Sequence, residues 1–138
     1  MKMTVYLDSN VFILAALSDG HKAAKAKELI KKIIMGQLAG ATSSLTIDEV
    51  VWVIWKETKD RSLAIDEGLR ILQFDNLKII EINGNIMRNS LDFMKSYESL
   101  KPRDAIHLSA ALSVNVSTIV SDDSDFDDVK EIKRNALN

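Results

Sequence analysis

The chain begins with a short apolar run that ends abruptly in polar residues. Val5-Tyr6-Leu7 is followed at once by Asp8-Ser9-Asn10 and then by the apolar stretch 11–17. A run of β-branched and aromatic residues this short predicts a buried strand that leads into a helix. Asp8 would then lie at the carboxyl end of that strand. In open α/β sheets this edge binds ligands, because helix N-termini point their free N–H groups into the crevice there.

The rest of the chain alternates between strand-like and helix-like patterns. Short apolar runs predict strands at 40–43, 77–82 and 117–120, and helical spacing recurs at 21–38, 47–58, 61–75, 86–97 and 103–113. Strands separated by helices predict a parallel sheet with helices on both faces. The expected fold class is therefore α/β, a three-layer α/β/α arrangement around a central parallel sheet, with residues 1–138 forming one domain.

Composition narrows the function classes. A chain of 138 residues with 46% hydrophobic residues can bury about two thirds of its unfolded surface. The absence of cysteine excludes disulfides and thiolate metal sites. No apolar run approaches the roughly 20 residues of a membrane span, and Met1-Lys2-Met3 leads directly into the first strand, so we expect a cytoplasmic protein without a signal peptide. The net charge of -2 argues against a globally basic nucleic-acid binder.

Acidic residues follow several of the predicted strands. Asp8 ends the first strand, Glu49 opens the helix after the second, and the acidic run 122–128 follows the last. All strand ends of a parallel sheet face the same edge, so the topology should bring these groups together. Asp104 is different, because its helix follows another helix and spacing does not assign it to either edge. An acid in a first helical turn is also favoured by the helix dipole alone.

The helix after the second strand carries features with two interpretations. Thr46-Ile47-Asp48-Glu49 matches a capping box, in which Glu49 would reach back to the start of its helix. This structural role and a catalytic role for Glu49 are about equally supported by the sequence. Trp52 and Trp55 lie on the same helix, where aromatic residues at helical spacing indicate core packing or, as a functional alternative, a subunit interface.

Several carboxylates at one sheet edge predict a cation site. Crowded carboxylates repel one another and take up protons unless a cation neutralises them. Mg²⁺ or Mn²⁺ prefers oxygen ligands, and the sequence has no Cys/His set suited to Zn²⁺; His21 and His107 stand alone and are expected to be structural. Metal-assisted phosphodiester hydrolysis suits such a cluster. Hydroxyl or amide groups to orient water or phosphate are available in Ser9, Asn10 and Ser43.

Four motifs in this order resemble those of the PIN-domain ribonucleases, most closely the small VapC-type toxins of toxin-antitoxin pairs. The motifs are LDSN at 7–10, SLTIDEVV at 44–51, PRDAIH at 102–107 and IVSDDSDF at 119–126, and the resemblance covers nearly the whole chain. It implies that Asp8, Glu49 and Asp104 are metal-site acids. The resemblance therefore implies that Asp104 lies at the same sheet edge as Asp8 and Glu49, which the spacing of the predicted elements does not establish.

The last motif of the family selects particular residues in the acidic run. A Ser or Thr is followed after one residue by an acid and then by Asp-Phe, which matches Ser121, Asp123 and Asp125 and leaves Asp122 as an extra acid. Asp123 is thus the implied fourth metal ligand, with Asp122 and Asp125 as alternatives. By the same resemblance, Ser9 and Asn10 support the first acid. An Mg²⁺ or Mn²⁺ cofactor, a homodimer and a small antitoxin partner are also implied.

The combined expectation is metal-assisted cleavage of RNA by an activated water, without a covalent enzyme intermediate. The implied catalytic residues are Asp8, Ser9, Asn10, Glu49, Asp104, Asp123 and Asp125, and the implied metal ligands are Asp8, Glu49, Asp104 and Asp123. Base readout is not evident, so recognition of RNA shape or of unpaired loops is expected. Lys101 and Arg103 are candidate phosphate contacts, although ordinary surface charge explains them equally well.

Three other classes remain as alternatives. A phosphatase of the haloacid dehalogenase type would carry a second Asp two positions after the first, where this chain has Asn10. A receiver-like signalling domain would place a lysine after a late strand, and residues 121–128 contain none. A non-catalytic interaction module would use the acids as helix caps and as solubilising charge.

Overall fold

The computed structural model describes residues 3–138; Met1 and Lys2, the predicted lead-in to the first strand, lie outside the described residues. The elements in chain order are β1 (Thr4–Leu7), α1 (Ser9–Leu17), α2 (His21–Ile34), β2 (Ala39–Ser43), α3 (Ser44–Thr58), α4 (Arg61–Leu72), β3 (Leu77–Ile80), α5 (Gly84–Ser96), α6 (Pro102–Ser113), β4 (Thr118–Val120), the 3-10 helix η1 (Ser124–Phe126) and β5 (Lys133–Asn135).

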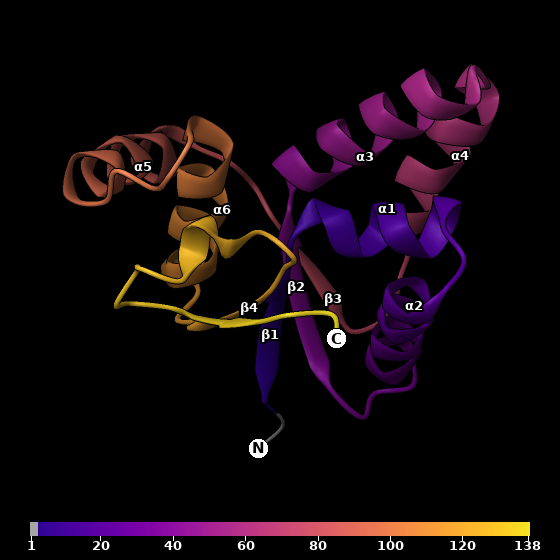
Figure 1. Ribbon diagram of the computed structural model, residues 1–138, viewed down its shortest axis with the longest axis horizontal. Coiled ribbons are helices and arrows are strands. Elements are labelled where there is room, and N and C mark those ends of the chain that lie inside the picture. The colour runs from indigo at the N-terminus through magenta and orange to yellow at the C-terminus, as the bar shows by residue number, and fades with distance from the viewer. Residues whose placement is uncertain (1–2) are drawn as a thin grey trace.

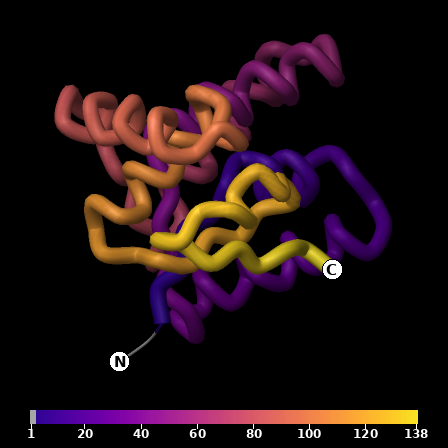
Figure 2. Tube along the Cα trace, turned by 60° about the vertical axis from the view of Figure 1, so that its left-hand side comes forward, coloured from indigo at the N-terminus to yellow at the C-terminus, as the bar shows by residue number. Residues whose placement is uncertain are grey.

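The strands form one parallel sheet, which confirms the predicted fold class. The strand order is β3-β2-β1-β4-β5, and β1 is central, paired with β2 on one side and β4 on the other. The fifth strand, β5, was not predicted from the sequence. It pairs with β4 at the outer edge of the sheet, where the yellow C-terminal segment lies in Figure 2. Its sequence, KRN, is polar and largely exposed, so it lacks the apolar pattern that marks a strand.

Alternate residues of β1 divide between two hydrophobic cores. Tyr6 packs with residues of α5 and α6, whereas Val5 and Leu7 pack with residues of α1 to α4. Successive side chains of a strand point to opposite faces, so this split places one core on each side of the sheet. Figure 1 shows the same layers, with α5 and α6 covering one face and α1 to α4 on the other. The central strand is therefore buried on both faces, and Asp8 follows directly at its carboxyl end.

Several predicted boundaries shift by a few residues. The helix predicted over 21–38 ends at Ile34 because Gly36 takes a left-handed conformation with φ 77°. The helix predicted over 61–75 ends at Leu72, and the strand predicted over 77–82 ends at Ile80. Pro102 occupies the first helical position of α6, as predicted.

The capping box predicted at 46–49 is wrong. Helix α3 begins at Ser44, directly after β2, so Thr46 lies inside the helix and Glu49 lies in its second turn. Thr46 Oγ1 is instead 2.7 Å from Thr42 Oγ1 in a buried hydrogen bond. Glu49 therefore has no capping role, and its carboxylate is free to face the edge of the sheet.

Thr42 links the two strands that carry the acidic edge. Its buried hydroxyl donates to the Leu7 carbonyl at 2.8 Å, just before Asp8. We expect Thr42→Val to lower the free energy of unfolding by about 1–3 kcal/mol, because a buried carbonyl and the Thr46 hydroxyl lose their partner. Urea denaturation measures this change. The control Thr118→Val, a half-buried strand residue outside this network, should change stability by less than about 0.5 kcal/mol; equal effects of the two variants would contradict the prediction.

Helices α3 and α4 form a pair that extends away from the sheet in both views (Figures 1 and 2). Trp52 and Trp55 on α3 are 53% and 41% exposed, so they are not core residues. Their rings meet edge-on at 6.1 Å between centroids, and the Arg61 guanidinium lies 5.7 Å from the Trp55 ring. Within residues 3–138, none of the helices has the length and apolar character needed to cross a membrane.

Candidate metal centre

Asp8 occupies the junction between β1 and α1 and is held there by hydrogen bonds from Ser9 and Ser121. It is the N-cap of α1, and its Oδ1 accepts the Ser9 backbone N–H at 2.7 Å. Its Oδ2 accepts the Ser121 hydroxyl at 2.6 Å, from the residue that follows β4. An Asp is favoured at an N-cap because its carboxylate satisfies a free N–H group of the first turn. These contacts fix the carboxylate at the sheet edge, as the sequence predicted for the end of the first strand.

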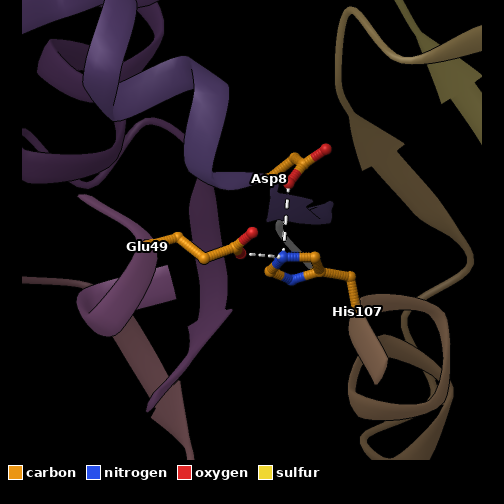
Figure 3. Close-up of side chains that lie close together, drawn as sticks. All are labelled: Asp8, Glu49 and His107. Carbon is orange, nitrogen blue, oxygen red and sulfur yellow. Dashed lines mark hydrogen bonds and ion pairs between the residues drawn. The ribbon is translucent and has the colours of Figure 1, made fainter. Parts of the chain in front are cut away.

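Asp8 lies in a first triad with Glu49 and His107. His107 Nε2 is 2.6 Å from Glu49 Oε1 and 3.4 Å from Asp8 Oδ1. The three side chains come from α3, α6 and the end of β1 and point toward one another (Figure 3). One ligand atom from each lies within 4.8 Å of the others. Asp8 and Glu49 thus come together as predicted, but with a histidine between them.

The prediction that His107 stands alone is wrong, because Glu49 and Asp8 lie beside it. Its side chain is 1% exposed and reaches into the acidic edge. A signal was present: His107 follows Asp104 by three positions, and residues three apart on a helix share a face. Burial lowers the pKa of His107, but the hydrogen bond that it donates to Glu49 and the charges of Asp8 and Glu49 outweigh this effect, so the pKa lies above its usual value of 6.5.

The other nitrogen of His107 meets a buried tyrosine. Nδ1 is 2.7 Å from the Tyr6 hydroxyl, and Tyr6 in turn donates to Ser43 Oγ at 2.9 Å. The two rings pack edge-on with centroids 5.6 Å apart. Burial raises the pKa of Tyr6 well above its usual range, so the phenol stays neutral. Ser43, predicted to orient water or phosphate, is instead bound to this tyrosine beneath the site.

A second triad consists of Asp104, Asp123 and Asp125, whose ligand atoms lie within 4.8 Å of one another. Asp104 accepts the Lys101 backbone N–H at 3.0 Å at the start of α6. Asp123 caps η1, and its Oδ1 accepts the Asp125 N–H at 2.9 Å. Lys101 Nζ lies 3.1 Å from Asp125 Oδ2. The acidic run therefore meets the start of α6, where the family resemblance placed Asp104.

Charge crowding in the second triad alters its titration. Burial and the neighbouring Asp123 raise the pKa of Asp104 from 3.8 to about 7. The hydrogen bond from Lys101 keeps the pKa of Asp125 below its usual value. Lys101 pairs with Asp125 and leaves the more buried Asp104 to take up the proton.

Ser121 joins the two triads. Its buried hydroxyl donates to Asp8 Oδ2 and accepts the Asp123 N–H at 2.9 Å, so one side chain spans both groups. Asn10 Nδ2 also approaches this hydroxyl at 3.3 Å. Asn10 Oδ1 is buried and has no hydrogen-bond partner within residues 3–138. The predicted acids thus gather at one edge as two linked triads, and not as one cluster of all four expected ligands.

The remaining charged residues of the motifs differ in their surroundings. Asp122 pairs with Lys22 at 3.0 Å and accepts the Leu137 N–H at 3.3 Å, so the extra acid serves the contact between α2 and the C-terminal segment. The exposed Arg103 guanidinium lies 4.0 Å from Glu49 Oε2. Arg103 and Lys101 therefore each stand beside one of the two triads.

The donor set fits a divalent cation. Five carboxylates and one imidazole meet at the edge, and oxygen ligands of this kind suit Mg²⁺ and Mn²⁺. The unpartnered Asn10 Oδ1 is a further neutral oxygen beside Ser121. Burial, together with the neighbouring Asp123, raises the pKa of Asp104, and a cation beside this carboxyl group would favour its ionised form.

Comparisons with known proteins found one family model and several similar solved structures. The PIN domain family model matches residues 5–132. No curated protein matches the sequence. Among solved structures, VapBC2 from Rickettsia felis bound to a promoter DNA fragment is 16% identical, with a TM-score of 0.74, and the match covers 97% of this chain and 98% of that one.

Two further structures show the same fold. VapC20 of Mycobacterium tuberculosis, described as a toxin that cleaves the sarcin-ricin loop, is 10% identical with a TM-score of 0.76, covering 91% of this chain and 95% of that one. A toxin-antitoxin complex from Klebsiella pneumoniae is 22% identical with a TM-score of 0.67, covering 94% and 95% of the two chains. At these identities the likeness establishes the fold.

Proposed function

The chain belongs to the PIN domain family, and on that premise we propose that it is a divalent-metal-dependent endoribonuclease, acting as a single domain over residues 1–138. The observation that carries this proposal is the convergence of acids from four separate elements. Asp8 follows β1, Glu49 lies on α3, Asp104 opens α6 and Asp123 precedes η1, yet all reach one edge of the sheet. Carboxylates crowded in this way repel one another, and a bound cation would relieve that repulsion.

The proposed ligands are Asp8, Glu49, Asp104 and Asp123. A bound divalent ion would supply a water of lowered pKa, neutralise the phosphate and stabilise the leaving oxygen. Asp8 is suited to hold such an ion because hydrogen bonds from Ser9 and Ser121 fix both of its oxygens. Asp123 is fixed through its own contacts with Asp125 and Ser121. The site is thus preorganised on the ends of strands and helices.

Cationic side chains beside the triads are the proposed phosphate contacts. Lys101 pairs with Asp125, and Arg103 approaches Glu49, so each can exchange a carboxylate for a phosphate oxygen as RNA enters. Arg103 also lines a pocket of about 300 Å³ with Ser9, Glu49 and Trp52, which opens next to the first triad. Such a recess beside the acids suits an unpaired nucleotide better than a regular duplex. Asn10 and Ser9 complete the proposed site.

The physiological role we propose is that of the toxin in a toxin-antitoxin pair, in the cytoplasm. Support comes from the shared fold with VapBC2 of Rickettsia felis and with the toxin-antitoxin complex of Klebsiella pneumoniae. A small antitoxin and a homodimer are the proposed protein partners. Exposed apolar residues provide surface for such contacts, including Trp52 and Trp55 on α3 and Leu69 and Leu72 on α4. Induced expression should arrest growth, and co-expression of the antitoxin should relieve the arrest.

The match to the PIN domain family favours a nuclease over the phosphatase-like and receiver-like alternatives. A non-catalytic interaction module remains distinguishable by calorimetry. Titration with Mn²⁺ should give saturable binding heat if the carboxylates form a metal site, and none if they serve only as caps and surface charge.

The direct test of the proposed function is RNA cleavage with controlled metal content. The purified chain should cleave a structured RNA with unpaired loops when Mg²⁺ or Mn²⁺ is present. Treatment with EDTA should abolish cleavage, and dialysis against either ion should restore it, because the proposed reaction uses a water whose pKa the metal ion lowers. Gel analysis of end-labelled RNA measures both steps. Cleavage that persists unchanged in EDTA would overturn the proposal.

A further inference from the structure

We propose that His107 Nε2 is a ligand of the metal ion held by Asp8 and Glu49, which gives the site a preference for Mn²⁺ over Mg²⁺. This inference rests on the proposed function, since it concerns the ion that the nuclease uses. It assigns a direct role to a residue that an all-carboxylate site would leave out.

The spacing of the first triad suits a shared ion. An ion of octahedral geometry with bonds of about 2.1 Å holds adjacent ligand atoms roughly 3.0 Å apart. His107 Nε2 lies 2.6 Å from Glu49 Oε1 and 3.4 Å from Asp8 Oδ1, on either side of that value. Small side-chain shifts would bring all three atoms to one coordination sphere (Figure 3).

The hydrogen bonds around His107 identify which of its two ring nitrogens is available to a metal ion. Tyr6 has one hydroxyl proton, and it goes to Ser43 Oγ at 2.9 Å. The Tyr6 oxygen therefore accepts from His107 Nδ1, which lies 2.7 Å away. In neutral His107 this leaves the Nε2 lone pair directed at two carboxylates. That arrangement is repulsive unless Nε2 carries a proton, which it can donate to Glu49 Oε1, or a metal ion takes the place of that proton between the two carboxylates.

The imidazole is held in the orientation that a ligand requires. His107 is 1% exposed, and its ring packs edge-on against Tyr6 with an interplanar angle of 64°. Metal-binding histidines are commonly fixed in this way, with the second nitrogen bonded to a neighbouring group that sets the tautomer. Tyr6 and Ser43 thus act as positioning residues for His107.

A nitrogen ligand changes the selectivity of the site. Mg²⁺ favours oxygen ligands and retains its waters, whereas Mn²⁺ accepts both carboxylate and imidazole donors. We expect Mn²⁺ to bind at least about tenfold more tightly than Mg²⁺. His107→Gln should weaken Mn²⁺ binding by about 10- to 100-fold, and Tyr6→Phe by about tenfold, because the first loses the ligand and the second only its positioning.

Pulsed electron paramagnetic resonance of bound Mn²⁺ tests the inference without relying on activity. The protein is prepared with natural-abundance histidine and with ¹⁵N-labelled histidine, and each is loaded with one equivalent of Mn²⁺. In the first sample we expect histidine ¹⁴N to modulate the electron spin echo of Mn²⁺. In the second sample this modulation should change to the ¹⁵N pattern. This comparison uses the unaltered protein, so it does not depend on whether a variant folds.

Variants of the two histidines assign the signal. The chain contains two histidines, and His21 is exposed at the start of α2, which makes His21→Gln the matched control. The modulation should persist in His21→Gln and disappear in His107→Gln. Mn²⁺ that binds without histidine modulation, or modulation that survives in His107→Gln, would overturn the inference and leave the proposed nuclease intact. Absence of saturable Mn²⁺ binding would overturn both.

Discussion

Replacing Asp8 with Asn should reduce RNA cleavage by about 100- to 1000-fold while the protein stays folded. Asn has nearly the same size, and its side-chain oxygen can still accept the Ser9 N–H that now lies 2.7 Å from Asp8 Oδ1. The amide group can donate to the Ser121 hydroxyl if that hydroxyl releases its longer contact with Asn10 Nδ2, now 3.3 Å. The substitution thus preserves the packing at the end of β1 and removes one negative ligand. Initial cleavage rates at saturating Mn²⁺, with thermal denaturation alongside, measure both effects.

A matched control separates the loss of a ligand from the loss of a charge. Asp66 lies on α4 with an exposed side chain, and Asp66→Asn removes one carboxylate from a site that we assign no role in metal or RNA binding. Its cleavage rate and melting temperature should match those of the unaltered protein. The toxic effect on growth should likewise vanish for Asp8→Asn and persist for the control. Undiminished cleavage by Asp8→Asn would remove the nuclease proposal.

Asp104→Asn should also reduce cleavage by about 100-fold or more, and it should stabilise the metal-free protein. The two effects have opposite signs because Asp104 shares its triad with Asp123 and Asp125. Without a cation, removal of one buried carboxylate relieves repulsion among the three. With a cation, the same substitution removes a ligand. Melting temperatures in EDTA and in Mn²⁺ measure the change in stability, and cleavage rates measure the loss of activity.

The pKa of Asp104 fixes the sign of the accompanying pH dependence. Its pKa is raised from 3.8 to about 7 in the folded, metal-free protein, so between these values the folded state binds more protons than the unfolded state. The titration of Asp104 should therefore lower the free energy of unfolding in EDTA as the pH rises from about 4 to about 7. Asp104→Asn should flatten that decrease, whereas Asp128→Asn, an exposed acid, should not. Identical pH profiles for all three proteins would contradict the assignment.

The fold was predictable because hydrophobic pattern and topology both specify it. The run at Val5–Leu7 is apolar on both faces, as a central parallel strand requires, and the later strands repeat this pattern between helices. Once the sheet is parallel, the position of Asp8 at the carboxyl edge of the strands follows. The edge strand β5 was missed because its residues, Lys133–Asn135, pair through the backbone and have no apolar face to reveal them.

The candidate site was less accessible to sequence reasoning. Spacing could not assign Asp104 to an edge, since the path between α5 and α6 is set by tertiary packing; only the family resemblance placed it. Glu49 appeared equally suited to a helix cap, and the start of α3 at Ser44 removed that alternative. For His107 the signal in the sequence is its spacing of three residues from Asp104, and that spacing does not reveal the other partners that the fold brings to it. Its neighbours Asp8 and Glu49 come from other elements.

The central claim is that the linked triads form one divalent metal site. A crystal structure of the protein with Mn²⁺, with anomalous diffraction measured near the manganese absorption edge, tests it most directly. We predict an anomalous peak about 2.1–2.3 Å from an Asp8 carboxylate oxygen, at the edge that Ser121 spans. An Mn²⁺-saturated crystal with no anomalous peak at this edge would contradict the account.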